Sequence, residues 1–456
     1  MQIKNILSKT MQLFGIKSNR TKNITKHVLL SSLYKGGHIV CSFLLVPLTI
    51  NFLDTENYGV WLTLSSFIAW FSFFDIGLGN GLRNKFAEAK ATNNLDFAKG
   101  YVSTAYYSIG SICVVFFLLS MLIGYWVDWT KIFNTSIEMK EQLQLLMPVV
   151  FGCFSLQLVL KLITSVYVGD QNHSINGKIS FLSAALSLFI VWILTLTAHS
   201  SLLLFGIIFS ALPIVILLFL NIYAFTGKYK VYTPDFAFWK KIYFKDIFGL
   251  GFSFFVIQIS VLVLFSTDNF IITQLFGPEE VVAYNIAYKY VGISNMIFTI
   301  LLTPYWSSIT EAYAKGELDW IRKAMKNLMK FMVGILLIII VLVLCSPWAY
   351  EIWLGDKVII PFGLTLSMAL FFAITMIYTP FNFFLNGVGK IRLHMIIFLV
   401  AAVINIPLSI FLVKATDWGI NGVILATSIC IFPNLILFPI QYYKLINKKA
   451  TGIWDK

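Results

Sequence analysis

The feature that most constrains this chain is a series of apolar runs, most of them about 20 residues long, separated by polar or charged segments. A helical run of that length crosses the roughly 30 Å hydrocarbon layer of a bilayer. Hydrophobic residues make up 58% of the 456 residues and charged residues only 12%, whereas a soluble domain carries roughly 25% charged residues. A soluble protein of this composition would lack the polar surface to cover its core. The sequence therefore predicts an integral protein that crosses the membrane many times.

Twelve runs are candidate spans, and we expect α-helices because lipid offers the backbone no hydrogen-bond partners. In the first half of the chain they lie near 28–50, 57–78, 101–127, 145–168, 179–198 and 201–225. In the second half they lie near 247–272, 281–305, 329–350, 361–386, 393–413 and 419–443. The predicted fold class is an all-α integral membrane protein with twelve transmembrane helices.

Basic residues indicate how these spans are oriented. If the N-terminus lies inside, 26 of the 34 Lys and Arg residues fall in inner segments and 4 in outer segments. Because cytoplasmic loops carry the excess of Lys and Arg, both termini are predicted to be cytoplasmic. The net charge of +13 then reflects topology and attraction to anionic membrane lipids, so no nucleic-acid partner is expected. The segment 1–17 has apolar residues near helical spacing and is expected to lie along the inner membrane surface.

A polar motif occurs twice, 223 residues apart. FAEAKATNNLDFAK at 86–99 aligns without a gap with ITEAYAKGELDWIR at 309–322, and the same shift places Glu56 on Glu279. Because six spans separate the copies, both halves have the same orientation in the membrane, which is a parallel 6+6 repeat. We predict two six-helix bundles: an N-terminal lobe at 1–225 and a C-terminal lobe at 247–456, joined by a cytoplasmic linker at 226–246.

Several ionisable side chains fall inside predicted spans, where a charge costs about 2.5–3.5 kcal/mol and normally faces a wet or protein-lined interior. Lys35, Lys161 and Lys289, with Arg83 at the inner end of the second span, are candidate ligands for an anionic substrate, because lysine is a point-charge partner for phosphate. Three further side chains are candidates for coupling or charge balance: Asp75, Asp268 and His38. Arg83 as a topology anchor, His38 as a packing residue and Asp268 as a solvated helix end are the competing interpretations.

Polar residues at helical spacing accompany these charges. We predict that they line a net-positive cavity between the lobes; the residues are Ser31, Ser42, Gln157, Tyr284, Asn285, Tyr288 and Asn295. The alternative for each polar stripe is hydrogen bonding between helices of a packed bundle. In FFDIGLGNGLRNKFAEAK, at 73–90, Gly77, Gly79 and Gly81 are expected to permit a bend or a close helix contact, as a hinge or gate. The five cysteines lie in apolar spans without CxxC spacing, which predicts neither disulfides nor metal ligands.

Four stretches resemble landmarks of a known family: FFDIGLGNGLRNKFAEA, LFGPEEVVAYN, LLTPYWSSITEAYAKGE and NGVGKIRLH. They resemble the Wzx-type flippases of lipid-linked oligosaccharides, in the polysaccharide-transport branch of the multidrug/oligosaccharidyl-lipid/polysaccharide (MOP) exporter superfamily. The resemblance covers essentially the whole chain. It implies two six-helix bundles around a V-shaped cleft and transport by alternating access.

The resemblance also implies a substrate and a setting. The substrate would be an oligosaccharide repeat unit, such as O-antigen, on undecaprenyl diphosphate, moved to the outer leaflet of a bacterial inner membrane. An H+ or Na+ gradient would drive transport without any other cofactor, and partners would include a polysaccharide polymerase and the chain-length machinery.

Two other functions are compatible with the same set of predicted spans. A multidrug cation antiporter would have an acidic or aromatic cavity, which the excess of lysine in the spans disfavours. A membrane polysaccharide polymerase would present catalytic groups on a large outer loop. The longest outer loop, 128–144, holds only three acids and two lysines, and the sequence contains no metal triad, nucleophile elbow or paired carboxylates. We therefore predict a transporter, with no catalytic and no metal-binding residues.

Overall fold

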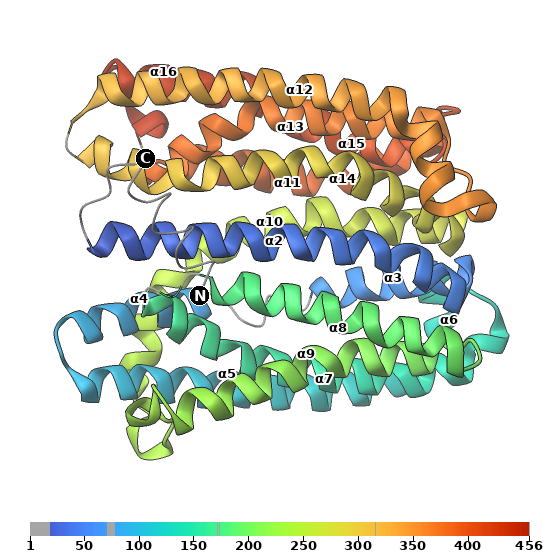
Figure 1. Cartoon of the computed structure of the whole chain (residues 1–456), viewed down its shortest axis with the longest axis horizontal. Coiled ribbons are helices and arrows are strands. Elements are labelled where there is room, and N and C mark those ends of the chain that lie inside the picture. Colours follow the sequence, from blue (N-terminus) through green and yellow to red (C-terminus); the bar gives the residue numbers. More distant parts are fainter. Residues whose placement is uncertain (1–18, 71–77, 171, 173, 315, 456) are drawn as a thin grey trace, which may run out of the picture. The chain divides into compact units, whose positions relative to one another are not determined.

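A computed structural model describes residues 19–70, 78–170, 172, 174–314 and 316–455. In those residues the regular secondary structure is helical (Figure 1). Nine helical segments there are long and apolar enough to cross a membrane, and they match nine of the predicted spans. The predicted all-α membrane class is thus confirmed, while the count of twelve spans stays a prediction. The expected surface helix at 1–17 lies outside the described residues.

The helices follow one another with short connections. In the N-terminal half they are α2 (Asn19–Leu53), α3 (Thr55–Trp70), α4 (Leu78–Ala91), α5 (Leu95–Trp126), α6 (Trp129–Phe133), α7 (Lys140–Gly169), α8 (Ile175–Thr197) and α9 (Leu202–Thr226). In the C-terminal half they are α10 (Lys241–Phe276), α11 (Pro278–Ala314), α12 (Leu318–Leu354), α13 (Phe362–Val388), α14 (Arg392–Ala415), α15 (Asn421–Ile431) and α16 (Asn434–Ile446). The three predicted spans outside the nine fall on α3 with the start of α4, on α10 and on α11.

The backbone repeats at the predicted offset of 223 residues. Shifted by 223, the end of α2 at Leu53 coincides with the end of α10 at Phe276, and the start of α3 with the start of α11. The end of α4 coincides with the end of α11 at Ala314, and the start of α5 with the start of α12. Even the left-handed residues correspond, because Asp54 and Asn93 have positive φ, as do Gly277 and Gly316. The internal repeat inferred from a few polar residues therefore describes the helix boundaries.

The chain divides into two compact units. Unit 1 comprises the described residues within Met1–Asp54, Phe71–Trp129 and Ile137–Phe255, and unit 2 those within Thr55–Trp70, Thr130–Ser136 and Val256–Lys456. Helix α3 therefore belongs with the C-terminal helices, and the first part of α10 with the N-terminal ones. The lobe boundaries predicted from the repeat stay a prediction.

Unit 1 has its core where α4, α5, α7 and the linker after α9 meet. Phe86, Val102, Ile163 and Tyr229 are at most 1% exposed there. Helix α4 approaches α10 closely: a Cβ on Gly81 would lie 2.2 Å from the carbonyl oxygen of Ile247. Gly81 therefore serves a close helix contact, one of the two roles expected for the glycines of this motif.

Unit 2 packs α11 between α3, α12 and α13. A Cβ on Gly59 of α3 would lie 1.9 Å from the carbonyl oxygen of Pro278, so the two helices approach with no room for a side chain. Small residues at such contacts let helix backbones pack closely in a membrane, where packing rather than hydrophobicity drives association.

Candidate functional site

The four predicted cationic ligands are divided between the two units. Lys35 on α2, Arg83 on α4 and Lys161 on α7 belong to unit 1, and all three side chains are exposed. Lys289 on α11 belongs to unit 2 and is half-buried. Unit 1 therefore carries three exposed cations on or beside predicted membrane-spanning helices. Their convergence with Lys289 on one cavity stays a prediction.

His38 lies where α2 packs against α8. Its Nδ1 donates a hydrogen bond to the carbonyl oxygen of Ser180, over 3.1 Å. One residue earlier, a Cβ on Gly37 would lie 2.6 Å from the ring of Phe181, so the two helices are in close contact. This geometry matches the packing interpretation of His38, and a coupling role for it stays a prediction.

The other predicted residues of unit 1 occupy varied settings. Ser42 and Gln157 are half-buried on α2 and α7, and Gly79 is buried on α4. Asp75, Gly77 and the side chain of Ser31 lie outside the described part of the chain.

Asp268 is the centre of a buried polar cluster in unit 2. Its side chain is on α10 and is 3% exposed, so the competing interpretation of Asp268 as a solvated helix end is wrong. Tyr284 of α11 donates a hydrogen bond to Asp268 Oδ2 over 2.6 Å, and Thr427 of α15 donates one to Oδ1 over 3.5 Å. Side chains of three helices, α10, α11 and α15, are thus hydrogen-bonded at one carboxyl group. An ionisable group buried in a membrane bundle needs such polar partners.

The cluster continues onto α14. Asn405 donates a hydrogen bond from its Nδ2 to Thr427 Oγ1 over 2.8 Å and is fully buried. Asn405 Oδ1 and Ser409 Oγ, one helical turn apart on α14, are buried and lack hydrogen-bond partners among the described residues. Buried polar atoms are normally paired, so these two oxygens on α14 have spare hydrogen-bonding capacity.

A second set of hydrogen bonds ties α3, α10 and α11 together. Asn285 donates to Asn269 Oδ1 over 2.8 Å, and Asn269 donates to Ser66 Oγ over 2.8 Å. Thr63 and Thr273 share a hydrogen bond of 2.6 Å. For Asn285 this geometry matches the alternative of hydrogen bonding between packed helices.

Two further predicted residues lie on α11. Tyr288 is 36% exposed and packs against Phe372, with ring centroids 5.1 Å apart. Asn295 is half-buried on α11.

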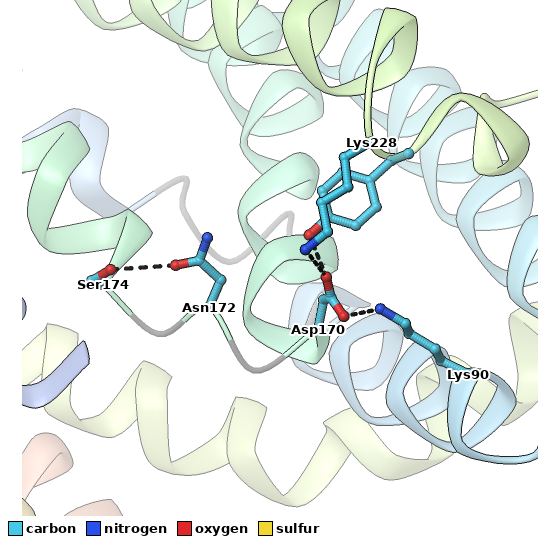
Figure 2. A network of polar contacts seen from close by, with 6 residues as sticks. Lys90, Asp170, Asn172, Ser174 and Lys228 are labelled. Carbon is cyan, nitrogen blue, oxygen red and sulfur yellow. Dashed lines mark hydrogen bonds and ion pairs between the residues drawn. The ribbon is translucent and has the colours of Figure 1, made fainter. Parts of the chain in front are cut away.

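Unit 1 contains an ionic cluster that was not predicted from the sequence (Figure 2). It holds the linker between α9 and α10 to the ends of α4 and α7. Asp170, at the C-terminal end of α7, forms ion pairs with Lys90 of α4 and with Lys228 of the linker. Tyr229 donates a hydrogen bond to the same carboxylate over 2.8 Å. The Asp170 side chain is only 10% exposed, so its charge is compensated mainly by these donors. Burial raises the pKa of Tyr229, which keeps its hydroxyl protonated as a donor.

The linker is held along α5 by further polar contacts. Asp235 pairs with Lys99 over 3.3 Å, and the Ala237 backbone N–H together with Lys99 lowers the pKa of Asp235. Asp170 directly follows a predicted span, and Asp235 lies among several lysines of the linker; these are the signals that could have marked the two residues.

Unit 1 also has an apolar groove of about 400 Å³. It is lined by Phe117, Pro148, Val149, Gly152, Cys153, Leu156 and Ile214, from α5, α7 and α9. None of the predicted site residues lines it. An all-apolar lining suits a hydrocarbon chain rather than a charged group.

Comparisons with known proteins agree with this architecture. The structure is similar to an inward-facing multidrug resistance MATE family transporter of the MOP superfamily, with a TM-score of 0.75, 14% identity, and coverage of 90% of this chain and 96% of the other. The model of the MatE family matches residues 254–411. The fold is that of multi-pass membrane proteins of the MATE type.

The model of the family described as "Polysaccharide biosynthesis protein" matches residues 24–310. The chain belongs to this family, and the predicted resemblance is confirmed. It is 22% identical over 378 residues to the "Putative O-antigen export protein" of Yersinia pseudotuberculosis, covering 81% of this chain and 85% of that protein. It is 23% identical over 425 residues to the "Putative O-antigen transporter" of Shigella flexneri, covering 90% and 96%.

Proposed function

We propose that the protein is a flippase, which moves an oligosaccharide repeat unit on undecaprenyl diphosphate to the outer leaflet of a bacterial inner membrane by alternating access. Both termini would be cytoplasmic. The observation that carries the proposal is that three exposed cations of unit 1 lie on or beside predicted spans: Lys35, Arg83 and Lys161, which form no ion pair with any described residue. Exposed cations within an apolar helix, as Lys35 and Lys161 are, are costly unless they face water or an anion. The relatives named as O-antigen transporters indicate which anion that would be.

The three cations suit a diphosphate head. Lysine and arginine attract phosphate by charge, and arginine can also bind it in a bidentate manner. The lipid tail would remain in the hydrocarbon layer, so the protein needs to shield only the polar head. No bond is made or broken in this transfer, which agrees with a site built from cations and amides.

Asp268 is the residue that we propose for coupling to H+ or Na+. It is buried and accepts hydrogen bonds from side chains of two other helices; one of these donors, Thr427, in turn accepts from Asn405, whose Oδ1 is unpaired among the described residues. A carboxylate surrounded by neutral oxygens can take up either a proton or a small hard cation. Lys289 and Asp75 remain candidates for substrate binding and charge balance.

Replacement of the cations tests the substrate. Lys35→Ala and Lys161→Ala, each in the chromosomal copy, should reduce surface glycan at least tenfold while the amount of protein in the membrane stays the same. Lys140→Ala is the matched control, because Lys140 is an exposed lysine at the start of the same helix as Lys161. Normal surface glycan in both variants would contradict the proposal.

A second measurement separates the flippase from its alternatives. In a deletion strain, undecaprenyl-linked repeat units should accumulate in the cytoplasmic leaflet. Translocated single units that fail to be joined would indicate a polymerase instead. A multidrug antiporter, which the MatE match favours, would leave the lipid-linked units unchanged and alter resistance to cationic drugs.

A further inference from the structure

The linker between α9 and α10 is fixed to α5 along its length. The backbone N–H groups of Asp235 and Lys240 donate to Ser103 Oγ and Thr104 Oγ1, over 3.1 and 3.2 Å. The indole Nε1 of Trp239 donates to Ser108 Oγ over 3.1 Å. With the Asp170 cluster at its start and the Asp235–Lys99 pair in its middle, the linker has a defined conformation.

Despite this fixation, residues 228–245 expose large apolar side chains; they comprise the linker and the start of α10 and are together called the linker from here on. Phe236 is 70% exposed, Ile242 62% and Val231 59%. Lysines alternate with them, and the exposed ones are Lys228, Lys230, Lys240, Lys241 and Lys245. Aromatic and aliphatic side chains interleaved with lysine are typical of segments that lie in a membrane interface, where the apolar groups enter the boundary region and the ammonium groups meet phosphates.

Helix α5 indicates the depth at which the linker lies. Phe236 packs edge-on against Tyr107 of α5, with ring centroids 5.3 Å apart. From Tyr107 to the exposed Trp126 at the other end of α5 are 19 residues, which at 1.5 Å per residue span about 28 Å. This matches the roughly 30 Å hydrocarbon thickness, and the exposed residues between them are mostly aliphatic, such as Val115, Leu118 and Leu122. Aromatic residues thus mark both ends of the lipid-facing stretch, as in the belts of membrane proteins.

We propose that the linker 228–245 is a binding surface for anionic phospholipid of the inner leaflet. Phe236, Trp239 and Ile242 enter the interface at the level of Tyr107, and Lys230, Lys240 and Lys241 bind the lipid phosphates. The charge of the surface selects anionic over zwitterionic lipid, and the fixed backbone presents both kinds of side chain at once. The surface is separate from the predicted substrate ligands and does not depend on which glycan is moved.

Lipid retention tests the charged half of the surface. The full-length chain is released from nanodiscs that contain phosphatidylglycerol and phosphatidylcholine, and the bound lipids are counted by native mass spectrometry. Each lysine near the surface contributes about fivefold in affinity for anionic lipid. The variant K230Q/K240Q/K241Q should therefore lose at least tenfold of the preference for phosphatidylglycerol. The matched control is K323Q/K326Q/K330Q, which removes three exposed lysines from the first part of α12. Lys323 and Lys326 are also predicted to be cytoplasmic, and Lys330 lies at the inner edge of a predicted span.

The control should keep the preference. Unchanged preference in the linker variant, or an equal loss in both variants, would overturn the proposal. Surface glycan in the linker variant is scored separately, so that a failed lipid preference and a failed flippase function are distinguishable.

Depth measurement tests the apolar half. In a full-length chain whose five native cysteines have been replaced, a nitroxide is attached at Ile242→Cys or, as the neighbouring control, at Lys241→Cys. The label at position 242 should be relaxed more by oxygen, and the label at position 241 more by a water-soluble nickel complex. Equal nickel access at both positions would show that the linker stands clear of the membrane.

Discussion

The ionic cluster around Asp170 gives the sharpest stability prediction. Asp170→Asn keeps the shape of the side chain but removes its charge, which leaves the ammonium groups of Lys90 and Lys228 facing each other without a counter-ion. Tyr229 can still donate its hydrogen bond to the amide oxygen. The substitution therefore isolates the charge from the packing.

The magnitude follows from burial. A hydrogen bond to a charged group contributes about 1.5–3 kcal/mol, but Lys90 and Lys228 are 38% and 61% exposed, so solvent screens both pairs. Exposed pairs contribute about 0–1 kcal/mol. Because Asp170 itself is only 10% exposed, we place the loss between these limits, at about 2 kcal/mol.

The matched control is Asp319→Asn. Asp319 pairs with Arg322 over 2.6 Å, but its side chain is 91% exposed, so this loss should be about 0.5 kcal/mol or less. The assay is thermal unfolding of the full chain in detergent, followed by the fraction that remains monodisperse. Asp170→Asn should lower the midpoint by several degrees and Asp319→Asn by about one.

A double substitution refines this test. Adding Lys228→Met to Asp170→Asn removes one of the two like charges and should recover part of the loss. The reasoning is refuted if Asp170→Asn costs no more than Asp319→Asn, or if Lys228→Met gives no recovery.

Two further predictions concern helix packing and the buried acid. Gly81→Ala would place a Cβ 2.2 Å from a backbone oxygen that cannot rotate away, so it should destabilise the protein by about 1–3 kcal/mol. Gly110→Ala, in α5 with nothing within 4 Å, should instead stabilise it by about 0.5–1 kcal/mol; thermal unfolding of both variants checks the sign, and equal effects would count against the contact. Asp268→Asn should retain the fold, because its oxygen still accepts from Tyr284, but should reduce surface glycan at least tenfold if Asp268 carries the coupling ion. The exposed Asp417→Asn serves as its control, and normal glycan in Asp268→Asn would exclude this coupling role.

Much of the helical framework was predictable because membrane insertion is decided locally. A window of about 20 apolar residues is enough to specify a span, and nine of the predicted spans were found as such. The repeat was also readable, because Glu88, Asp96 and their counterparts Glu311 and Asp319 stand out against an apolar background. The same shift places Asp54 and Asn93, which have positive φ, on Gly277 and Gly316, which also have positive φ.

The partners of the polar side chains were not predictable. Asp170 and Lys228 are 58 residues apart, and Asp268 and Thr427 are 159 residues apart. In a soluble helix, the polar face shows which side meets water. In lipid most faces are apolar, so the sequence carries little record of which helix meets which. For this reason the sequence could not decide between a solvated and an enclosed Asp268.

By itself, the sequence determined that the protein is helical and membrane-embedded, that its backbone repeats after 223 residues, and that it resembles polysaccharide transporters. Only the tertiary structure decided that α3 packs with the C-terminal helices, that Asp268 is enclosed by α11 and α15, and that Asp170 fastens the linker. Insertion depends on the composition of each segment, whereas these contacts depend on shape complementarity between segments far apart in the chain, which composition does not encode.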